Sequence, residues 1–129
     1  LNWAVRELGL EARVEVMNMD ARHVARSSLR GQALLVTARS FGSPAATAEI
    51  GAAFLKVGGT LVVSEPPIEK IEKQGLLERW PSMKMMPLGL VDSGCWHNGR
   101  FGYQALTCRG LTSERFPRAE KAMGDRPMF

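Results

Sequence analysis

An arginine and a phenylalanine stand directly after a hydrophobic run of the sequence. Residues 33–38 (ALLVTA) predict a β-strand that is buried on both faces, and Arg39 and Phe41 follow it. Ligands of open parallel sheets bind beyond the carboxyl ends of the strands. The guanidinium group of Arg39 suits a carboxylate or a phosphate, and the ring of Phe41 can stack on a base. The alternative roles are an ion pair between Arg39 and a helix acid, and a Phe41 that closes the edge of the sheet.

A carboxylate, Asp20, stands at the end of a second predicted strand. Residues 12–20 (ARVEVMNMD) alternate in polarity, with Val14 and Val16 on one face. Asp20 is therefore a second candidate for contact with a ligand at the edge of the sheet. Its alternative role is that of an N-cap, in which the carboxylate accepts hydrogen bonds from the first turn of the next helix.

Possible metal ligands are few and irregularly placed. Cys95, His97 and Cys108 form no Cys-x-x-Cys pair and have no regular spacing. We therefore predict no metal site. No pair of side chains stands out as a catalytic acid and base, so the catalytic residues stay unassigned.

The C-terminal segment, residues 111–129, is basic. It contains Arg115, Arg118, Lys121 and Arg126. We predict a tail that lies extended on the surface. Its charge fits contact with an RNA backbone or, alternatively, an ordinary solvated surface.

Helices and strands alternate across the first half of the chain. The sequence predicts a helix over residues 1–8, the strand near 12–20, a short helix, the strand 33–38, a helix from Ser43–Pro44 to Gly58–Gly59, and a strand over 60–67. This alternation is typical of a parallel α/β sheet. A charged helix over 68–81 follows, and residues 83–110 predict a short strand, a hairpin turn and a further strand.

Composition limits the class of protein. The chain has 129 residues, of which 45% are hydrophobic and 23% charged, as in one soluble globular domain. No run approaches the roughly 20 apolar residues of a membrane span, and two cysteines are too few for a disulfide framework, so we expect no membrane partner and a cytoplasmic location. The net charge of +4 permits an anionic partner such as RNA.

Several segments together resemble a known family. FLKVGGTLVV resembles the L-K-x-G-G-x-L segment of class I S-adenosylmethionine-dependent methyltransferases, and EVMNMDA resembles their third-strand motif. LVTARSFGSP resembles the fourth-strand segment of the glucose-inhibited division protein B family, which methylates N7 of a guanine in 16S rRNA. The ending, SERFPRA followed by RPMF, is similar to the ending of that family. The resemblance covers nearly the whole chain.

The resemblance implies an α/β fold with a Rossmann-like sheet in the strand order 3-2-1-4-5-7-6. The chain would be a single partial domain over residues 1–129, the C-terminal two-thirds of the family's domain, lacking the first two strands. The family's glycine-rich cofactor loop would lie upstream of Leu1, because a βαβ unit takes about 30 residues. We therefore expect the chain alone to bind S-adenosylmethionine poorly, unless an N-terminal segment or a second copy completes the sheet.

The resemblance also implies roles for single residues. Asp20 and Ala21 match the adenine side of the cofactor pocket, and Arg39 matches an arginine of the same pocket. Phe41 matches the mouth of the pocket, on the substrate side. Arg115 and Arg118 join it as expected contacts to ribosomal RNA.

Two departures set the chain apart from the family. Arg22 stands where the family usually has a glutamate, and residues 64–67 (SEPP) replace a lysine-glycine pair. The resemblance thus predicts a methyltransferase of 16S rRNA guanine N7 that is inactive unless the missing loop is supplied. The alternatives are a non-catalytic relative that acts as an interaction module and a methyltransferase of small molecules.

Overall fold

The structure is a computed structural model that describes residues 1–73, 78–98 and 101–129. Its helices and strands, in chain order, are α1 (Asn2–Glu7), α2 (Ala21–Val24), β1 (Ala33–Ala38), α3 (Pro44–Phe54), β2 (Leu55–Glu65), α4 (Ile68–Lys73), α5 (Ser82–Met85), η1 (Met86–Leu88), β3 (Leu90–Asn98), β4 (Phe101–Cys108) and α6 (Glu120–Asp125). The part of the predicted helix 68–81 that falls on residues 74–77 lies outside the described residues.

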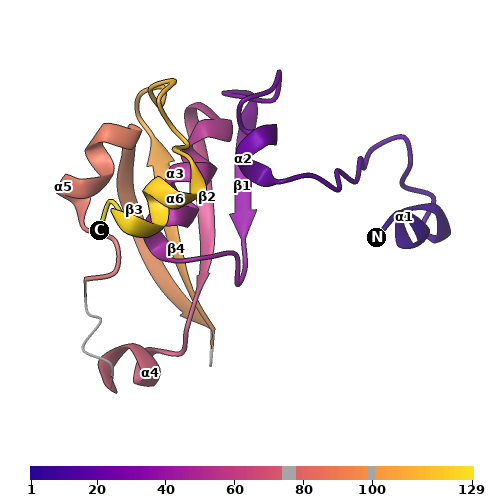
Figure 1. Cartoon of the computed structure of the whole chain (residues 1–129). Coiled ribbons are helices and arrows are strands. Elements are labelled where there is room, and N and C mark those ends of the chain that lie inside the picture. Colours follow the sequence, from indigo (N-terminus) through magenta and orange to yellow (C-terminus); the bar gives the residue numbers. More distant parts are fainter. Residues whose placement is uncertain (74–77, 99–100) are drawn as a thin grey trace.

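The strands form one open mixed sheet in the order β1-β2-β4-β3 (Figure 1). β1 and β2 run parallel, and β4 runs antiparallel to both β2 and β3. β4 therefore lies between two strands that precede it in the chain. The protein is an α/β protein, as the sequence predicts.

Helix α3 forms where the sequence places it and packs closely on the sheet. The Ser43 hydroxyl accepts a hydrogen bond from the Ala46 amide at 3.2 Å, and Pro44 occupies the first turn, where no amide donor is needed. Small residues line its buried side. At Gly51 an added Cβ would lie 2.9 Å from a methyl group of Leu61 in β2. Glycine at this position therefore allows the close approach of helix and strand.

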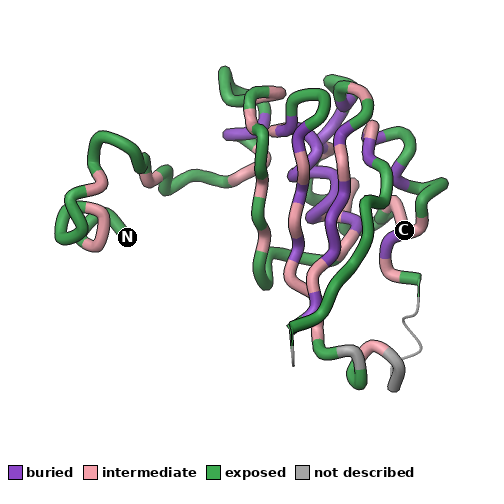
Figure 2. Tube along the Cα trace, turned by 180° about the vertical axis from the view of Figure 1, so that it is seen from behind, coloured by how far each residue is buried: buried purple, intermediate pink, exposed green. Residues whose placement is uncertain are grey.

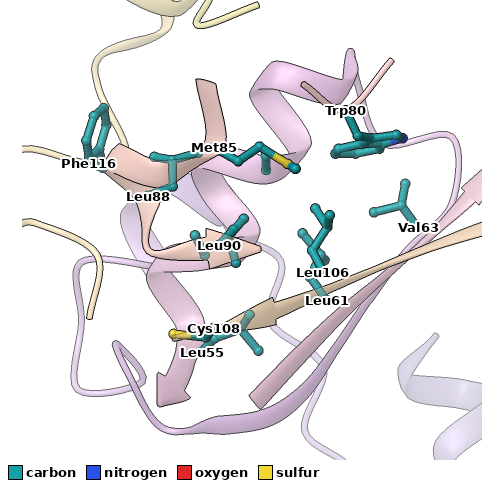
Figure 3. Close-up of a cluster of buried hydrophobic side chains, with 12 residues drawn as sticks. Leu55, Leu61, Val63, Trp80, Met85, Leu88, Leu90, Leu106, Cys108 and Phe116 are labelled. Atoms are coloured by element: carbon teal, nitrogen blue, oxygen red, sulfur yellow. The ribbon is translucent and has the colours of Figure 1, made fainter. Parts of the chain in front are cut away.

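The hydrophobic core lies on the face of the sheet that α3 covers (Figure 3). Alternate residues of β2 and β4 point into it, as in any strand with one buried face. Helices α5 and η1 and the C-terminal segment close this core. Its fully buried members include Leu55, Leu61, Met85, Leu88, Leu90, Leu106 and Cys108.

The edge strand β1 departs from its prediction. The strand itself is confirmed, but burial on both faces is wrong, because β1 lies at the edge of the sheet and Leu34 and Leu35 are 64% and 60% exposed. Figure 2 shows exposed residues along β1 and along β3, the two edges of the sheet.

The predicted strand over residues 12–20 is absent. The described segment runs irregularly from α1 to α2, and Val14, Met17 and Met19 are exposed. A strand needs a neighbour that satisfies its amides and carbonyls, and in this structure the segment has none. It forms an arm that carries α1 away from the rest of the molecule (Figures 1 and 2).

Two boundaries also differ from their predictions. Helix α3 ends at Phe54, so Gly58 and Gly59 lie within β2 rather than at the end of the helix. Gly58 has a φ of +84°, and the register between β1 and β2 shifts at this point, so the pair marks an irregularity of the strand. The C-terminal segment is not a simple extended tail, because it contains α6 and buries Thr112 and Phe116.

Among the described residues, no helix has the length and apolar character needed to cross a bilayer.

Candidate functional site

Arg39 lies at the carboxyl end of β1, immediately after the strand ends at Ala38. The next residue, Ser40, has a φ of +49°, a left-handed conformation that is uncommon outside glycine and clusters at functional sites. The Arg39 guanidinium carbon lies 5.9 Å from the centre of the Phe101 ring. Within the described residues, Arg39 takes part in no ion pair. Its charge is therefore available to a ligand.

A cavity of about 410 Å³ opens beside Arg39. It lies at the carboxyl ends of β1 and β2 and at the start of β4. Arg39, Phe41, Glu65 and Phe101 contribute to its walls. Its volume lies within the range of about 300–1,000 Å³ that is usual for small-molecule sites.

Glu65 is the acidic group of this cavity and is almost fully buried. Its side chain is 7% exposed. One carboxylate oxygen accepts a hydrogen bond from Arg79 Nε at 2.5 Å, and the other accepts one from Trp80 Nε1 at 3.0 Å. The ion pair with Arg79 compensates the buried charge, since an unpaired buried carboxylate would be strongly destabilising.

A second cavity, of about 470 Å³, lies on the other side of the loop after β1. Asp20 and Ala21 line it, together with the apolar side chains of Ala46 and Ile50. Glu120 and Met123 of the C-terminal segment complete the wall. The structure thus brings Asp20 and Ala21 together, but it places Arg39 in the first cavity.

Asp20 caps α2 and is held by Arg22. Its carboxylate accepts hydrogen bonds from the Arg22 amide at 2.9 Å and from the Arg22 guanidinium group, which also pairs with Glu120 at 3.0 Å. The side-chain hydrogen bonds from Arg22 lower the pKa of Asp20 well below its ordinary value. The alternative prediction for Asp20, that of an N-cap, is therefore confirmed. Its side chain also lines the second cavity.

Phe41 belongs to both cavities. Phe41 and Gly42 line the first cavity on one side and the second cavity on the other. The Phe41 ring is half exposed. The loop Phe41–Gly42 is therefore a partition between two adjacent cavities.

The two arginines of the C-terminal segment differ in their surroundings. Arg118 donates from Nη2 to Glu49 Oε2 at 2.8 Å, and these hydrogen bonds with Glu49 raise the pKa of Arg118. Its guanidinium group thus fastens the segment to α3. Arg115 is exposed and lies over the Phe116 ring, 4.8 Å from its centre. Contact of either residue with RNA stays a prediction.

The sulfur and imidazole side chains are dispersed. Cys95 is exposed on β3, whereas Cys108 is buried in the core, and burial raises the pKa of the Cys108 thiol. Over residues 1–73, 78–98 and 101–129 no three His, Cys, Asp or Glu side chains come together as a metal site would require.

Four residues of the first cavity were not predicted from the sequence as site residues: Glu65, Arg79, Trp80 and Phe101. Glu65 was noted only as a departure from the family, and Arg79 and Trp80 are 14 and 15 residues away from it. One signal was present: Glu65 ends a β-branched run before two prolines, the same position at a strand end that identified Arg39.

Comparisons with known proteins add no assignment. No protein-family model matches the chain, and no curated protein matches it in sequence.

Proposed function

We propose that the chain carries the part of a class I methyltransferase site that lies at the carboxyl ends of β1 and β2, and that the enzyme uses S-adenosylmethionine to methylate N7 of a guanine in 16S rRNA. The observation that carries the proposal is the strand order. The order β1-β2-β4-β3 corresponds to 4-5-7-6, the last four positions of the order 3-2-1-4-5-7-6. A reversal of the last two strands is a specific feature, which a simple parallel α/β sheet does not need.

The two cavities support the same proposal, because methyl transfer needs a donor and an acceptor in contact. Ala21, Ala46 and Ile50 form an apolar wall whose methyl groups can contact the face of an adenine ring. The Asp20 carboxylate beside them is already occupied on both oxygens by hydrogen bonds from Arg22, so it would shape this wall rather than offer acceptors to the ring. Across the Phe41–Gly42 partition, the Arg39 guanidinium group would hold the cofactor's carboxylate.

The chain's own residues have a modest chemical task. When bound, the sulfonium cofactor supplies an activated methyl group: the N7 lone pair forms the new C–N bond, the C–S bond breaks, and its electron pair stays on sulfur. N7 carries no proton, so the reaction needs no general base. Arg39 and Phe41 therefore contribute by orienting the two partners and excluding water.

Transfer of labelled methyl groups to 16S rRNA tests the proposal in the protein translated from the whole coding sequence. We expect incorporation at a guanine that becomes sensitive to cleavage specific for N7-methylguanine. Arg39→Ala should lower the rate about ten- to hundredfold, as loss of a hydrogen bond to a charged group does. Lys56→Ala is the control, because Lys56 is exposed near the start of β2, at the opposite end from Glu65. Absence of incorporation, or an Arg39→Ala rate equal to that of the control, contradicts the proposal.

The free edge of β1 favours a second candidate function, that of an interaction module. Among the described strands β1 has a neighbour on one side alone, so its outer edge, with two exposed leucines, offers backbone groups to another chain. Leu35→Lys should then abolish association measured by sedimentation velocity. A wild-type chain that stays monomeric at all concentrations contradicts this candidate.

A further inference from the structure

The first cavity contains a recognition element that the proposed function does not use. Glu65 ends β2 in the wall of the cavity and is held there by Arg79 and Trp80, which line the same cavity. A buried carboxylate fixed by two donors has a defined orientation, unlike the exposed carboxylates of the surface. Its position at the carboxyl end of a parallel strand is the position where ligands bind.

The Glu65 carboxylate has acceptor capacity left for a ligand. A carboxylate offers about four lone-pair positions, and the hydrogen bonds from Arg79 and Trp80 use one on each oxygen. One lone pair on each oxygen remains. Two acceptors side by side match a ligand that presents two neighbouring N–H donors.

The walls of the cavity suit a flat ligand. The rings of Phe41 and Phe101 are 50% and 55% exposed, and both line the cavity. Half-exposed aromatic rings at the rim of a site are typical stacking surfaces for unpaired bases. Arg39, above the Phe101 ring, adds a positive charge that attracts the phosphate of a free nucleotide when no cofactor carboxylate occupies it.

We infer that this cavity binds an unpaired guanine base and that Glu65 is the residue that selects it. Guanine is the common base whose Watson–Crick edge presents two adjacent donors, N1–H and the N2 amino group. Adenine presents an acceptor, N1, at the corresponding place, which would face a carboxylate oxygen. The rings of Phe41 and Phe101 provide stacking that does not depend on the base.

Binding through the Watson–Crick edge is compatible with methylation at N7. N7 lies on the Hoogsteen edge of guanine, so a base held at Glu65 by N1–H and the N2 amino group keeps its N7 lone pair free. The second cavity adjoins the first at Phe41 and Gly42. The role of N7 as acceptor rests on the proposed function, whereas the selection of guanine by Glu65 is a statement about binding alone.

Titration of the 129-residue chain with nucleoside monophosphates tests the inference. Three tryptophans give three indole N–H signals in a ¹H–¹⁵N spectrum, and that of Trp80 reports on Glu65, to which it donates. We expect guanosine monophosphate to shift this signal and to bind on the order of ten- to hundredfold more tightly than adenosine monophosphate. Inosine monophosphate, which lacks the N2 amino group, should bind with intermediate affinity.

Two variants separate selection from stacking. Glu65→Gln should remove the preference for guanine. Phe101→Leu should lower the affinity for both nucleotides about tenfold and keep the preference for guanine. Glu69→Gln removes an exposed charge outside the cavity and is the matched control. It should change neither the affinity for the nucleotides nor the preference for guanine. If Glu65→Gln does not fold, the Phe101→Leu variant and the inosine monophosphate titration still test the inference.

The outcomes decide between the two claims. Equal affinity for guanine and adenine nucleotides, no binding of either, or a preference that survives in folded Glu65→Gln overturns the inference. Titration with S-adenosylhomocysteine, followed in the protein from the whole coding sequence, tests the proposed function separately. A chain that selects guanine while that protein binds no S-adenosylhomocysteine would overturn the proposed function and leave the guanine site in place.

Discussion

The arginines before β1 and the arginine after it differ in the partners of their guanidinium groups. Before the strand, Arg30 donates to the carbonyl oxygens of Phe116 at 2.8 Å and Thr112 at 2.8 Å, and Arg26 donates to that of Pro117 at 2.6 Å. After the strand, the contact of the Arg39 guanidinium group within residues 1–73, 78–98 and 101–129 is with the Phe101 ring. We call the first region the anchored end of β1 and the second the open end.

The same contrast extends to the acidic residues of the two regions. In α3, Glu49 belongs to the anchored type: it is 1% exposed and accepts hydrogen bonds from the Arg118 amide at 2.6 Å and from the Arg118 guanidinium group. At the open end, Glu65 keeps acceptor positions toward a cavity. A charged residue whose hydrogen bonds the chain itself completes is structural, and one that the chain leaves incomplete is a candidate for ligand binding.

The largest expected effect on stability is that of Glu49→Gln. The substitution keeps the shape of the side chain but leaves the Arg118 guanidinium group without its counter-charge in a mostly buried place. Breaking such a pair costs about 3–5 kcal/mol in the free energy of unfolding. Urea denaturation measures it. Glu120→Gln, which removes an acid that is 82% exposed from its pair with Arg22, should cost less than about 1 kcal/mol. Equal effects of the two substitutions would contradict the contrast.

Arg30→Ala comes next in expected size. Its guanidinium group reaches four carbonyl oxygens, those of Ala25, Thr112, Ser113 and Phe116. Several of these carbonyls would lose a charged donor, so we expect a loss of about 2–3 kcal/mol, and thermal or urea unfolding measures it. Arg30→Lys should recover only part of this, because an ammonium group cannot reproduce the planar fork. Full recovery of stability by lysine would show that the positive charge stabilises the fold and that the planar geometry of the Arg30 guanidinium group does not contribute.

The sequence predicted the local features of both regions better than their long-range ones. The Ser43–Pro44 start of α3, the strand β1 and the end of β2 before two prolines depend on neighbouring residues, and the structure confirms them. The anchored end escaped prediction because its contacts join residues far apart in the chain: Arg118 and Glu49 are 69 positions apart.

The failed strand over 12–20 has a related cause. Alternating polarity indicates that a segment can lie on a sheet, but a strand forms only where a neighbour completes its hydrogen bonds. The leucines of β1 show the converse, since an apolar run predicts burial but cannot identify which elements cover it. For the site, residue type and position at a strand end identified Arg39 and Phe41. Glu65 becomes a site candidate only once its contacts with Arg79 and Trp80 and its place in the cavity wall are known.

A smaller effect on stability is expected from Gly102→Ala, at the open end. An added Cβ would lie 2.9 Å from the His97 ring and 3.2 Å from Glu65 Cβ. Such overpacking costs about 1–3 kcal/mol, and we expect the lower part of this range because the His97 side chain is exposed and can move. The Trp80 indole signal should shift as well, since Glu65 accepts its hydrogen bond. An unchanged Trp80 signal would show that Gly102 does not support the Glu65 side of the cavity.

The smallest effect on stability is expected from Arg39→Ala, and it tests the contrast most directly. No carboxylate or carbonyl partner of Arg39 lies within the described residues, so its removal should change the free energy of unfolding by no more than about 0.5 kcal/mol. Binding of nucleotides should nevertheless weaken, because the positive charge beside Phe101 is lost. Urea denaturation and nucleotide titration of the same sample measure the two quantities. A residue that contributes to ligand binding but not to folding produces this combination, whereas an arginine of the anchored type would lower stability by an amount comparable to Arg30→Ala.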